Sequence, residues 1–314
     1  MTPEQLSAIS VIKPVSPAIE KVKTILFKPF DIGKWFTIGF CAWLAFLGQG
    51  GVNFRANFPC RDFCRPGAPL DQVKNVFSEH FLLIAVLASF GLLIGLAVMI
   101  TLLWLNSRGR FMFLYCIAEN KAEVKTPWQN FRKPANSLWL FKLVSGFIVF
   151  ICLALCTAMI ALMVILLTKS YGRIRAAEIL AIVCLSLVTA LIAIASALFF
   201  KFTNDFVIPI MYLHPCSCSD AWRRFLQILP SRKGVFALYI LFQIVIAMAI
   251  AAILLALVFG TCCCAAFFLV IPYVGTVLML PLLVFKRAYS LYYLSQFGPD
   301  FDVFAAAAIA QQPE

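Results

Sequence analysis

The chain has 314 residues, of which 63% are hydrophobic and only 13% are charged, and its formal net charge is +12. Soluble domains carry about 25% charged residues, so this composition excludes a water-soluble protein. Apolar runs fill so much of the length that little remains for a separate soluble domain, which would need at least about 50 residues. We therefore expect a single membrane domain.

The N-terminal segment contains several prolines and no long apolar run, so a cleaved signal peptide is not expected. Residues 1–18 are predicted to be loosely ordered and cytoplasmic, residues 19–293 to form the transmembrane domain, and residues 294–314 to form a cytoplasmic tail. At the start of this domain, Ile19, Val22, Ile25 and Leu26 share one helical face. This pattern predicts an amphipathic helix that lies in the lipid headgroup layer.

Six apolar stretches approach or exceed the roughly 20 helical residues that a bilayer core requires. We predict six spans at about Lys34–Gly48, Phe81–Leu105, Leu138–Thr168, Ile179–Phe200, Val235–Phe259 and Cys264–Phe285. Their apolar residues run on continuously without a period of two, which favours helices over barrel strands. The predicted fold class is an all-α polytopic bundle of six transmembrane helices.

The lysines and arginines predict the orientation of this bundle. If the N-terminus is cytoplasmic, most of the 26 Lys and Arg residues lie in segments on the same side. The positive-inside rule then places both termini in the cytoplasm, and the expected location is a cell membrane. These cations would face the anionic headgroups of the lipid bilayer, so no nucleic-acid partner is needed to explain them.

A short sequence similarity indicates an internal repeat. The segment PWQNF at Pro127–Phe131 resembles AWRRF at Ala221–Phe225, 94 residues later, and ILFKPF at Ile25–Phe30 holds the equivalent place before the first span. We predict three parallel repeats, each an interfacial amphipathic helix followed by a helical hairpin. Convergence on an amphipathic composition is the alternative explanation.

The aromatic residues of these segments, Trp128, Phe131, Trp222 and Phe225, are predicted to be interfacial anchors. A role in gating access of a substrate is the alternative.

Polar clusters follow the cytoplasmic ends of the second, fourth and sixth spans. If these ends converge, they form a site for a phosphate or an anionic lipid headgroup. In that case Asp205 would pair with Arg110 or Arg287. The alternative is that these residues are ordinary flanking cations. The candidate site residues are Asn106, Arg108, Arg110, Asn204, Asp205, Lys286 and Arg287.

Inside the spans, ionisable residues are nearly absent, which disfavours a proton-coupled transporter. Lys142 lies near the start of its span and is expected to extend toward the membrane surface. Pro272 and Pro281 should interrupt the last span, because proline removes a backbone hydrogen bond.

Twelve cysteines raise the question of disulfide or metal chemistry. Cys60 and Cys64 lie on the exterior loop, where a disulfide between them is a plausible hypothesis. The best metal candidate is the segment His214–Cys218, but its three ligands lack the usual spacing of a zinc site. We therefore predict neither a metal site nor a cofactor.

The usual motifs of hydrolases, metalloproteases and nucleotide-binding proteins are missing, so an enzyme is not expected. The stretches PFDIGKWFTIGFCAWLAFLG at Pro29–Gly48 and RGRFMFLYCIAENKAEVKTPWQNFRKPANSLWLF at Arg108–Phe141 resemble an uncharacterised family of prokaryotic six-span membrane proteins. That family is similar to the membrane domain fused to some glycerophosphodiester phosphodiesterases. The resemblance implies a standalone helical membrane domain in the inner membrane of a prokaryotic cell, and the catalytic residues of the phosphodiesterase have no counterpart here.

The expected function is non-enzymatic handling of lipid or another amphipathic molecule. One alternative is a structural or accessory membrane protein that acts through a protein partner or a homo-oligomer. Another is a small-solute transporter.

Overall fold

The computed structural model describes residues 9–47, 81–169, 176–228, 233–261 and 264–309, and all regular secondary structure in these ranges is helical. The all-α prediction is therefore confirmed. Two short segments are not α-helical: η1 is a π-helical turn and η3 a 3-10 turn. In chain order the elements are α2 (Val15–Leu26), α3 (Ile32–Phe46), α5 (Phe81–Glu119), α6 (Lys125–Asn130), α7 (Arg132–Lys169), α8 (Ala176–Phe202), η1 (Thr203–Val207), α9 (Ile208–Leu213), α10 (Cys218–Ile228), α11 (Lys233–Gly260), α12 (Cys264–Val270), α13 (Pro272–Leu278), α14 (Leu280–Ser295), η3 (Pro299–Phe301) and α15 (Val303–Ile309).

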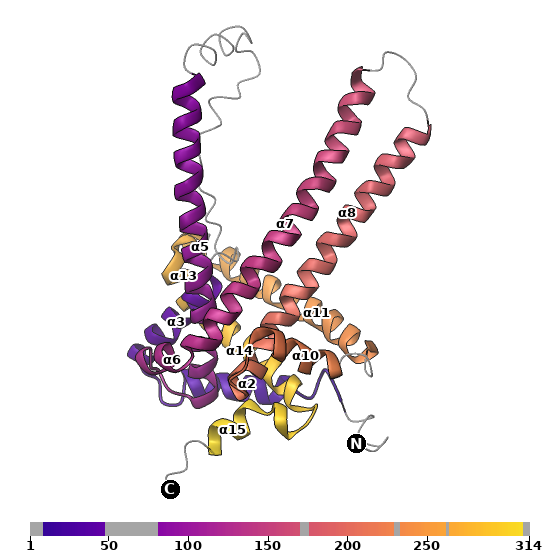
Figure 1. Cartoon of the computed structure of the whole chain (residues 1–314). Helices are drawn as coiled ribbons and strands as arrows, with labels where there is room; N and C mark the ends of the chain where they lie inside the picture. The colour runs from indigo at the N-terminus through magenta and orange to yellow at the C-terminus, as the bar shows by residue number, and fades with distance from the viewer. Residues whose placement is uncertain (1–8, 48–80, 170–175, 229–232, 262–263, 310–314) are drawn as a thin grey trace.

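Four helical stretches among the described residues are long and apolar enough to cross a membrane: Ala85–Glu119, Arg132–Leu167, Glu178–Leu213 and Gly234–Gly260. The upper part of α5 stands apart from the α7 and α8 pair, whose helices lie side by side (Figure 1). Large apolar side chains such as Phe90 on α5 and Leu191 on α8 are exposed there. Helices with apolar surfaces on all sides need an apolar surrounding, so these stretches are those of a membrane protein.

The first and last predicted spans are not long continuous helices. The first is α3, whose 15 residues extend only about 22 Å. The last is divided into α12, α13 and α14. Ile271, before Pro272, has extended backbone angles (φ −70°, ψ 116°), because a proline disfavours the helical conformation of the residue that precedes it. Pro281 lies at the start of α14, so both prolines interrupt this segment as predicted.

The packed core lies at the base of the molecule, where the long helices meet α2, α10, α14 and α15 (Figure 1). The apolar face of α2 packs against α14, and Ile25 and Leu26 are fully buried there. The part of this face around Ile25 and Leu26 therefore contacts protein, whereas the sequence predicted that it would contact lipid; Ile19 is exposed.

Both chain ends contribute to this core. The Tyr289 hydroxyl donates to the Val11 carbonyl oxygen at 2.9 Å, and the Gln296 amide donates to the Ser10 carbonyl oxygen at 3.1 Å. Near the other end, Val303 of α15 is fully buried. The ordered domain thus extends beyond the predicted limits of residues 19 and 293 on both sides.

A close helix crossing brings α3 against α5. A Cβ atom at Gly109 would lie 2.5 Å from backbone atoms of Leu44 and Ala45, so only glycine permits this approach. One turn before Gly109, the Asn106 amide donates to the carbonyl oxygens of Ala45 at 2.7 Å and Leu47 at 2.8 Å. These carbonyl groups at the end of α3 lack a helical partner, and Asn106 satisfies them.

Candidate functional site

The candidate site is built around the π-helical turn η1, where Pro209 disturbs the regular hydrogen bonding. The Ile208 N–H donates to the Thr203 carbonyl oxygen, five residues earlier, which is the π pattern. The next donor in this pattern would be residue 209, but proline has no N–H. The Asn204 carbonyl oxygen is therefore left without a helical partner, and Arg287 Nη1 of α14 donates to it at 2.6 Å.

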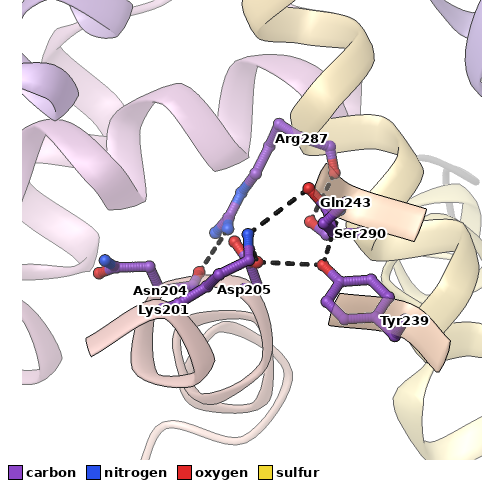
Figure 2. A network of polar contacts seen from close by, with 7 residues as sticks. All are labelled: Lys201, Asn204, Asp205, Tyr239, Gln243, Arg287 and Ser290. Carbon is purple, nitrogen blue, oxygen red and sulfur yellow. Dashed lines mark hydrogen bonds and ion pairs between the residues drawn. The ribbon is translucent and has the colours of Figure 1, made fainter. Parts of the chain in front are cut away.

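A closed ring of side chains lies beside this turn (Figure 2). Lys201 Nζ donates to Asp205 Oδ2 at 2.9 Å, and the Tyr239 hydroxyl donates to the same oxygen at 3.0 Å. The Gln243 amide nitrogen donates to the Tyr239 hydroxyl at 3.0 Å, and Lys201 donates to the Gln243 amide oxygen at 3.5 Å. The ring connects α8 and η1 to α11.

The predicted pairing of Asp205 with Arg110 or Arg287 is wrong, because its ion-pair partner is Lys201, one turn earlier in the same helical stretch. The side chains of Lys201 and Asp205 are 28% and 15% exposed, so this pair is partly shielded from water. Arg287 is nevertheless close enough to be influenced by this carboxylate. Burial lowers the pKa of Arg287 to about 10, and Asp205 opposes this shift, so the guanidinium stays charged at neutral pH.

Two arginines at the site have unused donor groups. Arg110 of α5 donates through Nε to Asn106 Oδ1 at 2.9 Å, and its Nη2 is buried without a partner. Arg287 uses Nη1 on the Asn204 carbonyl oxygen, and its Nη2 is likewise buried without a partner. Unsatisfied guanidinium donors are unfavourable in a protein interior, so this arrangement suits a ligand that accepts hydrogen bonds.

Both arginines line a cavity of about 290 Å³ between α3, α5, α8, η1 and α14. Its cationic residues are Arg110, Lys201, Lys286 and Arg287, and the lining contains a single carboxylate, Asp205. The lining also contains the apolar side chains of Phe46, Phe113, Ala197, Phe200 and Leu283. The cavity lining therefore combines several cations with apolar side chains.

The structure thus brings together Arg110, Asn204, Asp205, Lys286 and Arg287 of the predicted site. Asn106 lies behind them and positions Arg110 through its amide oxygen. Arg108 lies elsewhere: its guanidinium is held between the rings of Trp104 and Trp128, at 4.4 Å and 4.6 Å from the two ring centres.

Three members of the polar ring, Lys201, Tyr239 and Gln243, were not predicted as site residues. Lys201 and Asp205 are four residues apart, and so are Tyr239 and Gln243, a spacing that places two side chains on one face of a helix. This spacing was the available signal for each pair. The contact between the pairs depends on how α8 and α11 pack.

Lys142 of α7 does not extend toward the membrane surface, as the sequence suggested. Its side chain is 6% exposed, and the buried Nζ has no hydrogen-bond partner. The charged side chains of Arg110 and Arg287 lie near this buried amine.

The four predicted interfacial anchors all pack on aromatic rings of the long helices or their extensions. Trp128 contacts Trp104, and Phe131 stacks on Tyr212 with ring centres 4.9 Å apart. Trp222 stacks on Phe199 at 4.7 Å, and Phe225 stacks on Phe206 at 5.3 Å. Phe225 is fully buried, so it contacts protein and not the headgroup layer.

Cys60 and Cys64, the proposed disulfide pair, lie outside the described residues. In the part of the chain that the structure describes, no group of three His, Cys, Asp or Glu side chains is arranged to hold a metal ion. Within the segment His214–Cys218, Cys218 is buried, and burial raises the pKa of its thiol to about 12.

No curated protein and no solved structure matches the chain. A family model described as a family of unknown function (DUF7544) matches residues 9–278. This match includes η1, α10, α11 and the cavity residue Arg110, and it ends before Lys286 and Arg287 of α14. Because the match covers most of the chain, the protein belongs to this family of unknown function.

Proposed function

We propose that this protein binds an amphipathic anion, such as an anionic lipid, with the charged headgroup in the basic cavity. The observation that carries the proposal is that Arg110 and Arg287, which both line the cavity, each have a buried Nη2 atom without a hydrogen-bond partner. Cavities for drug-sized ligands begin at about 300 Å³, so this one suits a headgroup better than a whole lipid.

The apolar side chains of the cavity lining support a membrane ligand over a soluble anion. Ala197 and Phe200 of α8 line the cavity, and the same helix continues with the exposed apolar side chains of Ile194 and Leu191. Residues three apart are neighbours on a helix surface, so these side chains form a continuous apolar row that winds around α8. Acyl chains can therefore lie along α8 while the headgroup contacts the arginines.

The proposal includes six membrane crossings in three repeated units, with both termini in the cytoplasm of a prokaryotic cell. Each unit begins with a short helix before a hairpin: α2 precedes α3, α6 precedes α7, and α10 precedes α11. The first and last crossings would run through α3 and through α12 to α14. The excess of Lys and Arg on the side of the cavity supports the orientation.

Ring contacts that recur along the chain support the repeat. Trp128 contacts Trp104 and Phe131 stacks on Phe111 in one unit. Trp222 stacks on Phe199 and Phe225 stacks on Phe206 in the next. Trp222 and Phe225 follow Trp128 and Phe131 by 94 residues. Their ring partners Phe199 and Phe206 follow Trp104 and Phe111 by 95 residues. A relationship to the membrane domain fused to glycerophosphodiester phosphodiesterases remains part of this proposal, without its catalytic activity.

Lipid retention tests the proposed function. The protein is extracted in mild detergent, purified, and its bound lipids are quantified by mass spectrometry. We expect the unchanged protein to retain anionic lipid in roughly equimolar amount, and the double variant Arg110→Gln, Arg287→Gln to lose it. Arg223→Gln, which changes an exposed arginine of α10, is the matched control.

Lys286→Gln keeps the test informative if the double variant does not fold. Lys286 lines the cavity but is exposed, so its replacement should reduce lipid retention without affecting folding. Equal retention in unchanged protein, Lys286→Gln and the control, or no anionic lipid at all, would overturn the proposal.

A further inference from the structure

The free donors and the charge balance of the cavity indicate a narrower class of ligand than anionic lipids in general. We infer that the cavity selects a terminal phosphomonoester group, as carried by a phosphatidate-type lipid, over the phosphodiester group of most phospholipids. This inference rests on the proposed function and specifies the chemical class that the site recognises.

The first argument is the arrangement of donors. Arg110 and Arg287 come from two different helices, α5 and α14, and each has one buried Nη2 free. Asn106 accepts from Nε of Arg110 and the Asn204 carbonyl oxygen accepts from Nη1 of Arg287, so the orientation of both side chains is set without a ligand. Lys286 supplies a third cation to the cavity lining. Three separate donors match the three terminal oxygens of a phosphomonoester, whereas a phosphodiester has only two such oxygens.

The second argument is the charge of the site. Asp205 is compensated by Lys201, with which it forms an ion pair at 2.9 Å, and the Tyr239 hydroxyl also donates to it. The charges of Arg110, Lys286 and Arg287 therefore have no counterion in the described cavity lining. A phosphomonoester carries a charge of about −1.5 to −2 at neutral pH, and a phosphodiester carries only −1. The phosphomonoester offsets more of this surplus.

The polar ring has a defined part in this selectivity. By holding Lys201 against Asp205, Tyr239 and Gln243 keep the one carboxylate of the lining neutralised. An uncompensated carboxylate next to the arginines would occupy their donors or repel a phosphate. The ring therefore leaves both guanidinium groups available to the ligand.

A competition experiment tests the inference. The protein is delipidated in detergent, and its affinities for phosphatidic acid and phosphatidylglycerol with identical acyl chains are measured by native mass spectrometry. We expect phosphatidic acid to bind about tenfold more tightly, the effect of one additional charge-assisted hydrogen bond. Arg287→Gln should remove this preference, and Arg223→Gln should retain it. Inorganic phosphate is added in a third arm as a competitor.

The outcomes separate the inference from the proposed function. Equal binding of both lipids, with loss of both in Arg287→Gln, overturns the phosphomonoester inference and leaves the proposed function intact. Binding of neither lipid overturns both. Strong binding of inorganic phosphate with no gain from the acyl chains supports the phosphomonoester chemistry but overturns the lipid as its source. Lys286→Gln provides a second test, because replacing this exposed side chain should reduce the preference for phosphatidic acid over phosphatidylglycerol without unfolding the protein.

Discussion

Arg287 of α14 donates through Nη1 to the backbone carbonyl oxygen of Asn204 in η1 at 2.6 Å. This contact joins the last long helix of the described chain to the π-helical turn. It exists because Pro209 has no N–H to donate to that carbonyl group. The missing N–H of Pro209 therefore interrupts the helical hydrogen bonding at η1 and also orients Arg287 in the cavity.

Replacing Pro209 with Ala should weaken ligand binding. Alanine provides the missing N–H, which then competes with Arg287 for the Asn204 carbonyl oxygen and favours a regular α-helix. A hydrogen bond to a charged group contributes about 1.5–3 kcal/mol, so Arg287 should become less well oriented. We expect lower anionic lipid retention at an unchanged or higher melting temperature in detergent. Pro215→Ala, at an exposed proline before α10, is the control, and equal retention in both variants would contradict this account.

Replacing Asp205 with Ala should destabilise the fold. Lys201 would lose its ion-pair partner and the Tyr239 hydroxyl its acceptor, in a site that is partly shielded from water. Removing one member of such a pair leaves an uncompensated polar group, which costs about 1–3 kcal/mol. The measurement is the thermal midpoint in detergent, compared with Asp300→Ala at an exposed carboxylate. Equal midpoints would mean that the ring does not stabilise the helix packing.

Gly109 should tolerate no side chain. A Cβ atom there would collide with the backbone of Leu44 and Ala45, and α3 and α5 would have to separate. Overpacking of this kind costs about 1–3 kcal/mol, so Gly109→Ala should lower the thermal midpoint and the yield of folded protein.

Gly95→Ala is the matched control for Gly109→Ala, because it lies on the same helix with open space around it. It should be neutral or slightly stabilising, since alanine is the better helix former. A Gly109→Ala variant as stable as Gly95→Ala would show that the two helices do not approach as closely as described.

Arg108 should affect stability but not ligand binding. Its guanidinium lies between the Trp104 and Trp128 rings and outside the cavity, although the sequence grouped it with the site. Cation–π contacts contribute about 0.5–2 kcal/mol each, depending on burial. Arg108→Gln should therefore lower the thermal midpoint and change tryptophan fluorescence, while lipid retention per folded molecule stays constant. A selective loss of lipid would place Arg108 in the site after all.

The elements of the candidate site were predictable to different degrees. Arg110, Asp205 and Arg287 stand out as cations and a carboxylate at the ends of apolar stretches, and the cavity contains all three. The partner of Asp205 was not predicted correctly, because only Arg110 and Arg287 on other helices were considered and the neighbouring Lys201 was not. Tyr239 and Gln243 could not be assigned to the site, since nothing local connects α11 with η1.

By itself, the sequence determined the helical class, the membrane surroundings and the interruption of the last predicted span by Pro272 and Pro281. These properties follow from composition, run length and the chemistry of proline, which act locally along the chain. Only the tertiary structure decided that Phe225 is buried, that Arg108 lies between two tryptophans and that Arg110 and Arg287 face the same cavity. These relationships depend on which helix faces meet, and contacts between residues far apart in the chain have no local signal.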